Sequence, residues 1–109
     1  MNTVIIHGKV VQPGKMVMVN IKGIENTVAI FTVVDIGTPN KDEEPLFIQV
    51  NYRKFSADNL CKYLVKGKEL LITGSLKLRY AAGKQIYFIE ADEIVLLPLF
   101  KAANEGDAN

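Results

Sequence analysis

Apolar and polar positions alternate along much of this 109-residue chain, and the alternation predicts a protein built mainly of β-strands. Three early runs are rich in β-branched residues and are predicted to be strands: residues 3–12, 16–21 and 28–36. Gly8 lies inside the first run, where a glycine often marks a bulge or a bend. Pro13-Gly14 predicts a turn after the first run, and residues 22–27 predict the turn of a long, curved hairpin.

The next predicted strand has two unequal faces. It follows residues 37–45 (GTPNKDEEP), whose two prolines and four charged residues predict an exposed loop. In residues 46–55 (LFIQVNYRKF), one face consists of Leu46 and every second residue up to Tyr52, and it suits a core. The other face carries rings, amides and a cation: Phe47, Gln49, Asn51, Arg53 and Phe55. This second face is neither a core nor an ordinary solvated surface, so we expect it to contact a partner.

A short amphipathic helix is predicted next, because the apolar period changes from two to that of a helix. The apolar residues at helical spacing are Ala57, Leu60, Cys61, Leu64 and Val65. Ser56 is a typical N-cap residue, and Gly67 stands where a C-cap glycine belongs. Cys61 lies on the apolar stripe, which indicates a packed structural thiol and not a nucleophile.

Two more strands are predicted beyond the helix, at residues 70–79 and 85–97, joined by a short hairpin loop at residues 80–84. The alternation fails around Glu90–Glu93, which predicts a bulge or a bend. Pro98 ends the last strand. We therefore expect one domain over residues 1–98 and a short flexible tail over residues 99–109.

Five strands with a single helix between the third and the fourth indicate an all-β protein with one helix. This is the order of an OB-fold, a five-stranded Greek-key barrel that closes its sheet. The content of 49% hydrophobic and 23% charged residues is typical of one globular domain. The sequence shows no signal peptide and no membrane span, and its single cysteine cannot form an intramolecular disulfide. We expect a cytoplasmic protein.

The net charge of +1 hides an uneven distribution of charge. Residues 51–84 contain eight basic and two acidic residues, whereas acidic residues gather at 42–44 and in the last quarter of the chain. Such a basic region is typical of a surface that contacts a polyanion, and lysines that merely solvate a helix and a hairpin would produce it as well.

Catalytic and metal-binding residue patterns are scarce. The chain has one histidine, His7, within an apolar strand, and no His/Cys cluster at metal-ligand spacing. Asp42, Glu43 and Glu44 are adjacent in a predicted loop, which is a poor way to hold two carboxylates at a fixed separation. We therefore expect a protein that is not an enzyme and needs no cofactor or metal.

Residues 47–79 (FIQVNYRKFSADNLCKYLVKGKELLITGSLKLR) resemble the bacterial-type single-stranded DNA-binding proteins, the SSB family. The family's helix, AE(N)xxxYLxKG, is matched by residues 57–67, and its next strand, hxhxGxLxxR, by residues 70–79. The opening NTVIIHGKV and the closing IYFIEADEIVLL are also similar, so that the resemblance covers about residues 2–97. The chain looks like a short, divergent member without the family's acidic C-terminal tip, of the kind that a phage or mobile element encodes. Recruitment of replication proteins through such a tip is not expected.

The resemblance implies sequence-tolerant binding of single-stranded DNA, with a base stacked on Phe47 and polar contacts from Gln49 and Asn51. Arg53 stands where the family's second stacking ring falls, and Ala81 stands at the stacking position of the fourth strand. Rings suit any base because every base has a π-face, while Lys and Arg neutralise phosphates. The residues expected to contact the DNA are Phe47, Gln49, Asn51, Arg53, Lys54, Phe55, Lys77, Arg79, Tyr80, Lys84 and Tyr87.

The resemblance also implies a homotetramer, or at least a homodimer, in which first strands pair across subunits. The apolar outward face expected at that interface is formed by Thr3, Ile5, His7 and Val11. Two alternatives stay open at this point: an OB-fold adaptor whose groove serves a protein partner, and an OB-fold protein that binds RNA.

Overall fold

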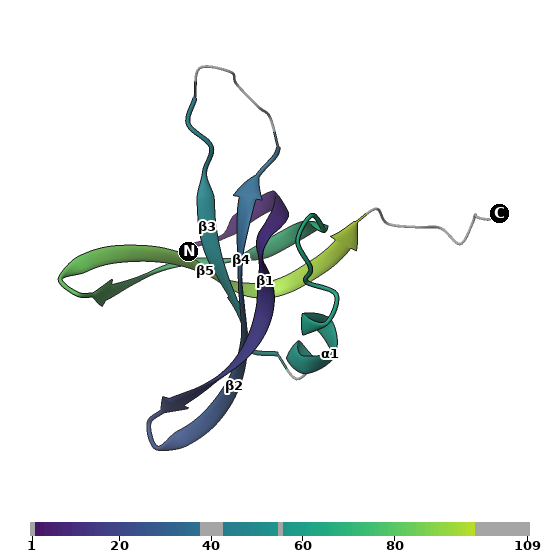
Figure 1. Cartoon of the computed structure of the whole chain (residues 1–109). Helices are drawn as coiled ribbons and strands as arrows, with labels where there is room; N and C mark the ends of the chain where they lie inside the picture. The colour runs from purple at the N-terminus through teal and green to yellow at the C-terminus, as the bar shows by residue number, and fades with distance from the viewer. Residues whose placement is uncertain (1, 38–42, 55, 98–109) are drawn as a thin grey trace.

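The chain forms five strands and one short helix in the order β1 (Val4–Ile21), β2 (Ile24–Asp35), β3 (Phe47–Tyr52), α1 (Ala57–Cys61), β4 (Glu69–Ala81) and β5 (Lys84–Leu97). The computed structural model describes residues 2–37, 43–54 and 56–97. The strands close into a barrel in the spatial order β1-β2-β3-β5-β4, with β3 and β5 parallel and the other neighbours antiparallel (Figure 1). The predicted OB-fold architecture, with its helix between β3 and β4, is confirmed.

The barrel interior is filled by apolar side chains from all five strands, with Ala57 of α1 and Leu64 added from the helical region. Among the described residues, Phe31 is the largest fully buried side chain, and Val50, Ile72 and Ile89 are fully buried around the same core. These residues alternate with exposed ones because successive strand residues point to opposite faces. Residues outside the described ranges are 38–42 of the loop predicted at 37–45, Phe55, Pro98 and the predicted tail at 99–109.

The predicted turn at Pro13-Gly14 is wrong, because β1 runs through it as one strand of 18 residues. The strand absorbs the two residues in register shifts against β2, between Val10 and Gln12 and between Gln12 and Lys15. The irregularity therefore follows Gly8, which itself pairs with both β2 and β4. The Gly14 N–H donates to the carbonyl oxygen of Leu64 at 2.8 Å, and a Cβ on Gly14 would lie 2.9 Å from the Leu64 Cβ. Gly14 is thus explained by close approach of another segment.

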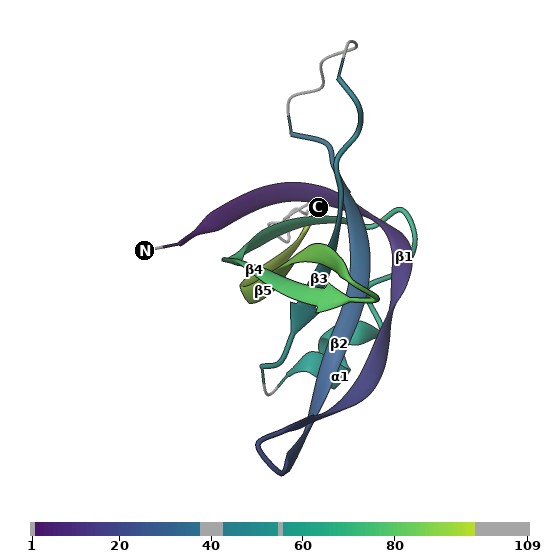
Figure 2. The ribbon, with the colours of Figure 1, turned by 90° about the vertical axis from the view of Figure 1, so that its left-hand side faces the viewer.

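Two-residue turns close both long hairpins. Lys22 and Gly23 have φ of 52° and 81°, and Ala82 and Gly83 have φ of 52° and 77°. Two positive φ values in succession are the signature of a type I′ turn, which matches the twist of paired strands. The loops predicted at residues 22–27 and 80–84 are therefore shorter than expected, and the β1–β2 and β4–β5 hairpins extend beyond the barrel as two arms (Figures 1 and 2).

The helix ends earlier than predicted. It spans five residues, its C-cap is Lys62 and not Gly67, and the Ser56 side chain makes no capping hydrogen bond. The following backbone hydrogen-bonds to β1 instead: the Gly67 N–H donates to the Val10 carbonyl oxygen, and the Val10 N–H donates to the Lys68 carbonyl oxygen, both at 2.8 Å. This pairing draws the chain out of the helix. As a result Val65, predicted to be buried, is exposed.

The predicted irregularity near Glu90–Glu93 is confirmed. Thr73 pairs with Glu93 and Gly74 pairs with Ala91, so that Asp92 is the extra residue of a bulge. Gly74 is buried at this point, and a Cβ on it would collide with the Glu90 carbonyl oxygen and lie 2.8 Å from the Ala91 Cα. The bulge sharpens the bend that lets β5 pair with both β3 and β4.

None of the helical segments in the described ranges has the length and apolar character needed to span a membrane.

Candidate nucleic-acid interface

The outer side of β3 presents a ring and two amides at the centre of one barrel wall. Phe47 is 57% exposed, and Gln49 and Asn51 are half-buried, with the Gln49 Nε2–H donating to the Asn51 Oδ1 at 2.9 Å. Ile48, Val50 and Tyr52 point inward, so the two predicted faces of this strand are confirmed over residues 47–52. Leu46 departs from the prediction, because it precedes the strand and is exposed. Tyr52 is in the core and cannot offer its ring to a ligand.

The neighbouring strand β5 adds Phe88 and Glu90 to this wall. In the parallel register, Phe88 lies beside Gln49 and Glu90 lies beside Asn51. Both side chains face outward, since the residues between and after them, Ile89 and Ala91, are buried. Sequence reasoning missed both residues and named Tyr87 instead.

An ion pair links β3 to β5. Arg53, directly after β3, places its Nη2 atom 2.7 Å from the Glu90 Oε2 atom, and about a third of each side chain is exposed. Charge-assisted hydrogen bonds of this length are the stronger kind. Arg53 therefore lies on the predicted face, and its charge is balanced by a residue that sequence reasoning missed.

Cations from the β4–β5 hairpin extend the wall. Lys77 of β4 pairs with Phe88, and Arg79 pairs with Ile86, so these two cations point to the same side as Phe88. Lys84 pairs with Ala81 and shares that side near the hairpin turn. Neither Lys77 nor Arg79 forms an ion pair with another residue of the described ranges. We call the combined surface the β3 face: Phe47, Gln49, Asn51, Arg53, Lys77, Arg79, Lys84, Phe88 and Glu90.

Tyr80 and Tyr87, both predicted to stack on DNA, lie on the opposite side of the hairpin. Tyr87 pairs with Leu78, and Tyr80 pairs with Gln85, in the row that continues from the buried Ile89. Tyr80 is 68% exposed, and Tyr87 is 53% exposed. The structure therefore does not bring them together with Phe47, because one residue of offset in a strand reverses the side chain's direction.

Lys54 is exposed but lies at the start of the helical region, where its carbonyl oxygen accepts the N–H of Ala57 at 2.9 Å. It lines a shallow recess with Met16, Thr27, Ala57 and Asp58. Phe55, the remaining predicted contact, is outside the described residues.

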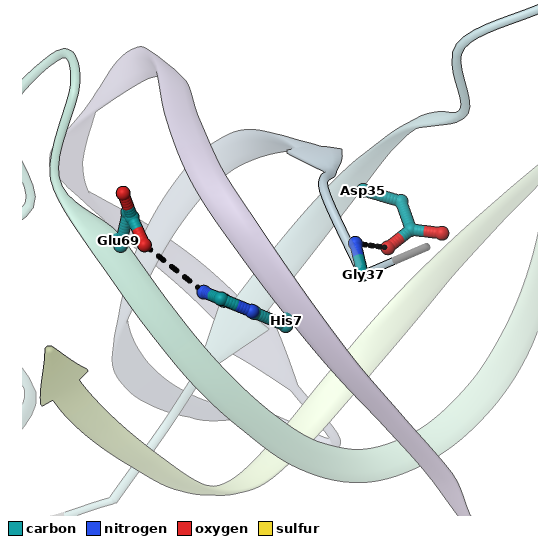
Figure 3. Close-up of polar contacts among 4 residues, drawn as sticks. All are labelled: His7, Asp35, Gly37 and Glu69. Atoms are coloured by element: carbon teal, nitrogen blue, oxygen red, sulfur yellow. Dashed lines mark hydrogen bonds and ion pairs between the residues drawn. The ribbon is translucent and has the colours of Figure 1, made fainter. Parts of the chain in front are cut away.

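The predicted interface residues are only partly brought together. Ile5 is 67% exposed and pairs with Thr73, and His7 pairs with the exposed Leu71, all on the outer side of β1 and β4. The His7 Nε2 atom lies 3.1 Å from the Glu69 Oε1 atom across the same two strands (Figure 3). Thr3 precedes β1, and Val11 falls in the register shift after Val10.

The backbone that follows β2 is held by Asp35, whose Oδ1 atom accepts the N–H of Gly37 at 2.9 Å (Figure 3). This contact shapes the first residues after the strand that flanks Phe47.

Cys61 is partly buried and packs against the core. Burial raises the pKa of the Cys61 thiol, so the neutral form is favoured. This agrees with the predicted structural role. Among residues 2–37, 43–54 and 56–97, no group of three or more His, Cys, Asp or Glu residues is placed to hold a metal ion.

Comparison with known proteins gives one family and several structures. The model of the single-strand binding protein family matches residues 1–94. No curated protein matches the chain.

Solved structures share the fold at low sequence identity. A Plasmodium falciparum SSB in complex with ssDNA superposes with a TM-score of 0.68 at 21% identity, covering 89% of this chain and 95% of that one. A small single-stranded DNA-binding protein from Streptomyces coelicolor gives 0.66 at 18%, covering 86% and 90%. The SSB domain of a Synechococcus sp. protein gives 0.65 at 17%, covering 86% and 93%.

Proposed function

This chain belongs to the single-strand binding protein family, and from that membership we propose that it binds single-stranded DNA through the β3 face, without catalysis and without base preference. The proposed role is to coat and protect exposed strands in replication, recombination or repair, and the proposed location is the cytoplasm. The observation that carries the proposal is the combination of two outward rings, Phe47 and Phe88, with the cations Lys77 and Arg79 on one wall of the barrel.

Each part of the β3 face suits one part of a single strand. A base that stacks on a ring gains about 1–3 kcal/mol, whichever base it is. Lys77 and Arg79 are exposed, so they can neutralise backbone phosphates as the strand passes from β3 to the hairpin. Gln49 lies beside Phe88, and Asn51 is the next outward residue of β3, so both amides can hydrogen-bond to base edges or sugars.

The test is a titration with oligo(dT) at several salt concentrations. We expect tight binding at low salt, and a log affinity that falls with log salt at a slope of about −0.7 per phosphate neutralised. Competition with an RNA oligomer of the same length separates DNA from RNA binding. No binding to either oligomer at low salt would contradict the proposal and favour the adaptor alternative.

We further propose that the protein assembles as a homotetramer. A tetramer with two-fold symmetries needs two different self-complementary contacts. The chain offers two exposed apolar surfaces: Ile5 with Leu71 on the barrel, and Leu78, Tyr80 and Tyr87 on the hairpin. Large apolar patches on a monomer commonly mark such contacts.

A further inference from the structure

We propose that Glu90 lowers the affinity for DNA, because it neutralises Arg53 on the β3 face. The inference rests on the proposed function. It starts from the 2.7 Å contact between the Arg53 Nη2 and the Glu90 Oε2 atoms. Arg53 would otherwise be an unpaired cation directly beyond the amides of β3, and Glu90 gives this part of the face no net charge.

The position of Glu90 makes its effect direct. Its strand neighbours are Asn51 on β3 and Ser75 on β4, and both are uncharged. Arg53 is therefore the cation that balances Glu90 among the described residues. The carboxylate lies one outward position along β5 from Phe88, beside the path of any strand whose base stacks on that ring.

A phosphate can bind at this part of the β3 face in two ways, and Glu90 disfavours both. If the ion pair stays closed, the phosphate meets a neutral pair and releases no counterion for Arg53. If Arg53 turns to the phosphate, the Glu90 carboxylate loses its partner and repels the polyanion from close range. A partly exposed ion pair contributes little to folding, so the stability of the barrel does not depend on it.

The experiment is salt-dependent oligo(dT) binding by Glu90→Gln, a substitution that keeps the size of the side chain and removes its charge. We expect binding about two- to five-fold tighter at low salt. We also expect a salt slope steeper by about 0.7, because Arg53 then neutralises one more phosphate. Thermal unfolding followed by circular dichroism verifies that the variant folds.

Two matched variants isolate the pair. Glu93→Gln removes the same charge from the same strand at a position that pairs with Thr73, and its salt slope should equal that of the wild type. The double variant Arg53→Gln/Glu90→Gln should return to the wild-type slope.

The proposed effect of Glu90 is contradicted if Glu90→Gln leaves the salt slope unchanged, if it weakens DNA binding, or if the double variant keeps the steeper slope. A wild-type protein that binds no oligo(dT) at any salt concentration refutes the proposed function instead. The two failures are therefore distinguishable.

Discussion

Phe88 and Tyr87 are consecutive residues of β5 that point to opposite sides of the β4–β5 hairpin. Phe88 lies between Gln49 of β3 and Lys77 of β4, in the middle of the β3 face. Tyr87 lies against Leu78 on the other side. The stacking surface is therefore set by one ring of the pair, and the other ring is free for a different contact.

Removal of either ring of the β3 face should weaken DNA binding. For Phe47→Ala and for Phe88→Ala we expect a loss of about 5- to 150-fold in affinity for oligo(dT), which corresponds to about 1–3 kcal/mol of stacking per base. Fluorescence anisotropy with a labelled oligonucleotide of about 10 nucleotides measures this loss on single subunits.

Two other aromatic residues provide controls. Tyr63 is 53% exposed beyond α1, and Tyr63→Ala should bind as the wild type does. Tyr87→Ala should also keep its affinity for the short oligonucleotide. If Tyr87→Ala lost as much affinity as Phe88→Ala, the hairpin would bind DNA with its other side.

Cations of the hairpin should determine the salt dependence. Lys77→Ala and Arg79→Ala should each reduce the magnitude of the slope of log affinity against log salt by about 0.7, with similar losses for every base composition. Lys66→Ala, in the exposed segment after α1, is the matched control and should leave the slope unchanged. Equal slopes for all three variants would show that the strand does not follow the hairpin.

An assembly experiment should distinguish the contributions of the two apolar surfaces to the tetramer. Ile5→Lys places a charge on the barrel contact, and Tyr87→Lys places one on the hairpin contact. Each variant should form dimers, and the double variant should form monomers of 12.1 kDa, measured by light scattering after gel filtration. Tetramers in the double variant would show that neither surface holds the assembly.

Gly74→Ala should destabilise the barrel. The added Cβ meets the Glu90 carbonyl oxygen and the Ala91 Cα, which belong to backbone and cannot turn aside. We expect a decrease of about 1–3 kcal/mol or more in the free energy of unfolding, measured by urea denaturation. Gly37→Ala is the control, because among the described residues its Cβ meets only the Asp35 Oδ1 atom, at 3.3 Å, and it should change stability little.

The thiol of Cys61 should react slowly in the folded protein. Burial raises its pKa, so at pH 8 the folded chain holds less thiolate than the unfolded chain does. Labelling with a thiol reagent should accelerate when urea unfolds the protein. Equal rates with and without urea would indicate that Cys61 is not packed.

Local patterns predicted the strands and the inward residues well. Val50 and Tyr52 are buried and Phe47 and Asn51 face outward because strand alternation is a property of neighbouring residues. The bulge near Asp92 was likewise visible where the alternation failed.

Contacts between distant segments account for the errors. Pro13-Gly14 resembles a turn, but strand pairing and the Leu64 carbonyl oxygen hold this segment in β1. The residues that follow α1 form backbone hydrogen bonds with Val10, and this pairing ends the helix early. The choice between Tyr87 and Phe88 depends on which side of β5 adjoins β3, and no local pattern contains that information.

Closure of the barrel also constrains the order of events during synthesis. Val4 pairs with Gly74, and β3 pairs with β5, which ends at Leu97. Such pairings between distant residues form slowly, because the long intervening loops must lose entropy first. During synthesis β1 can pair first only with β2. The N-terminal half of β1 can pair with β4 only after β4 has emerged from the ribosome.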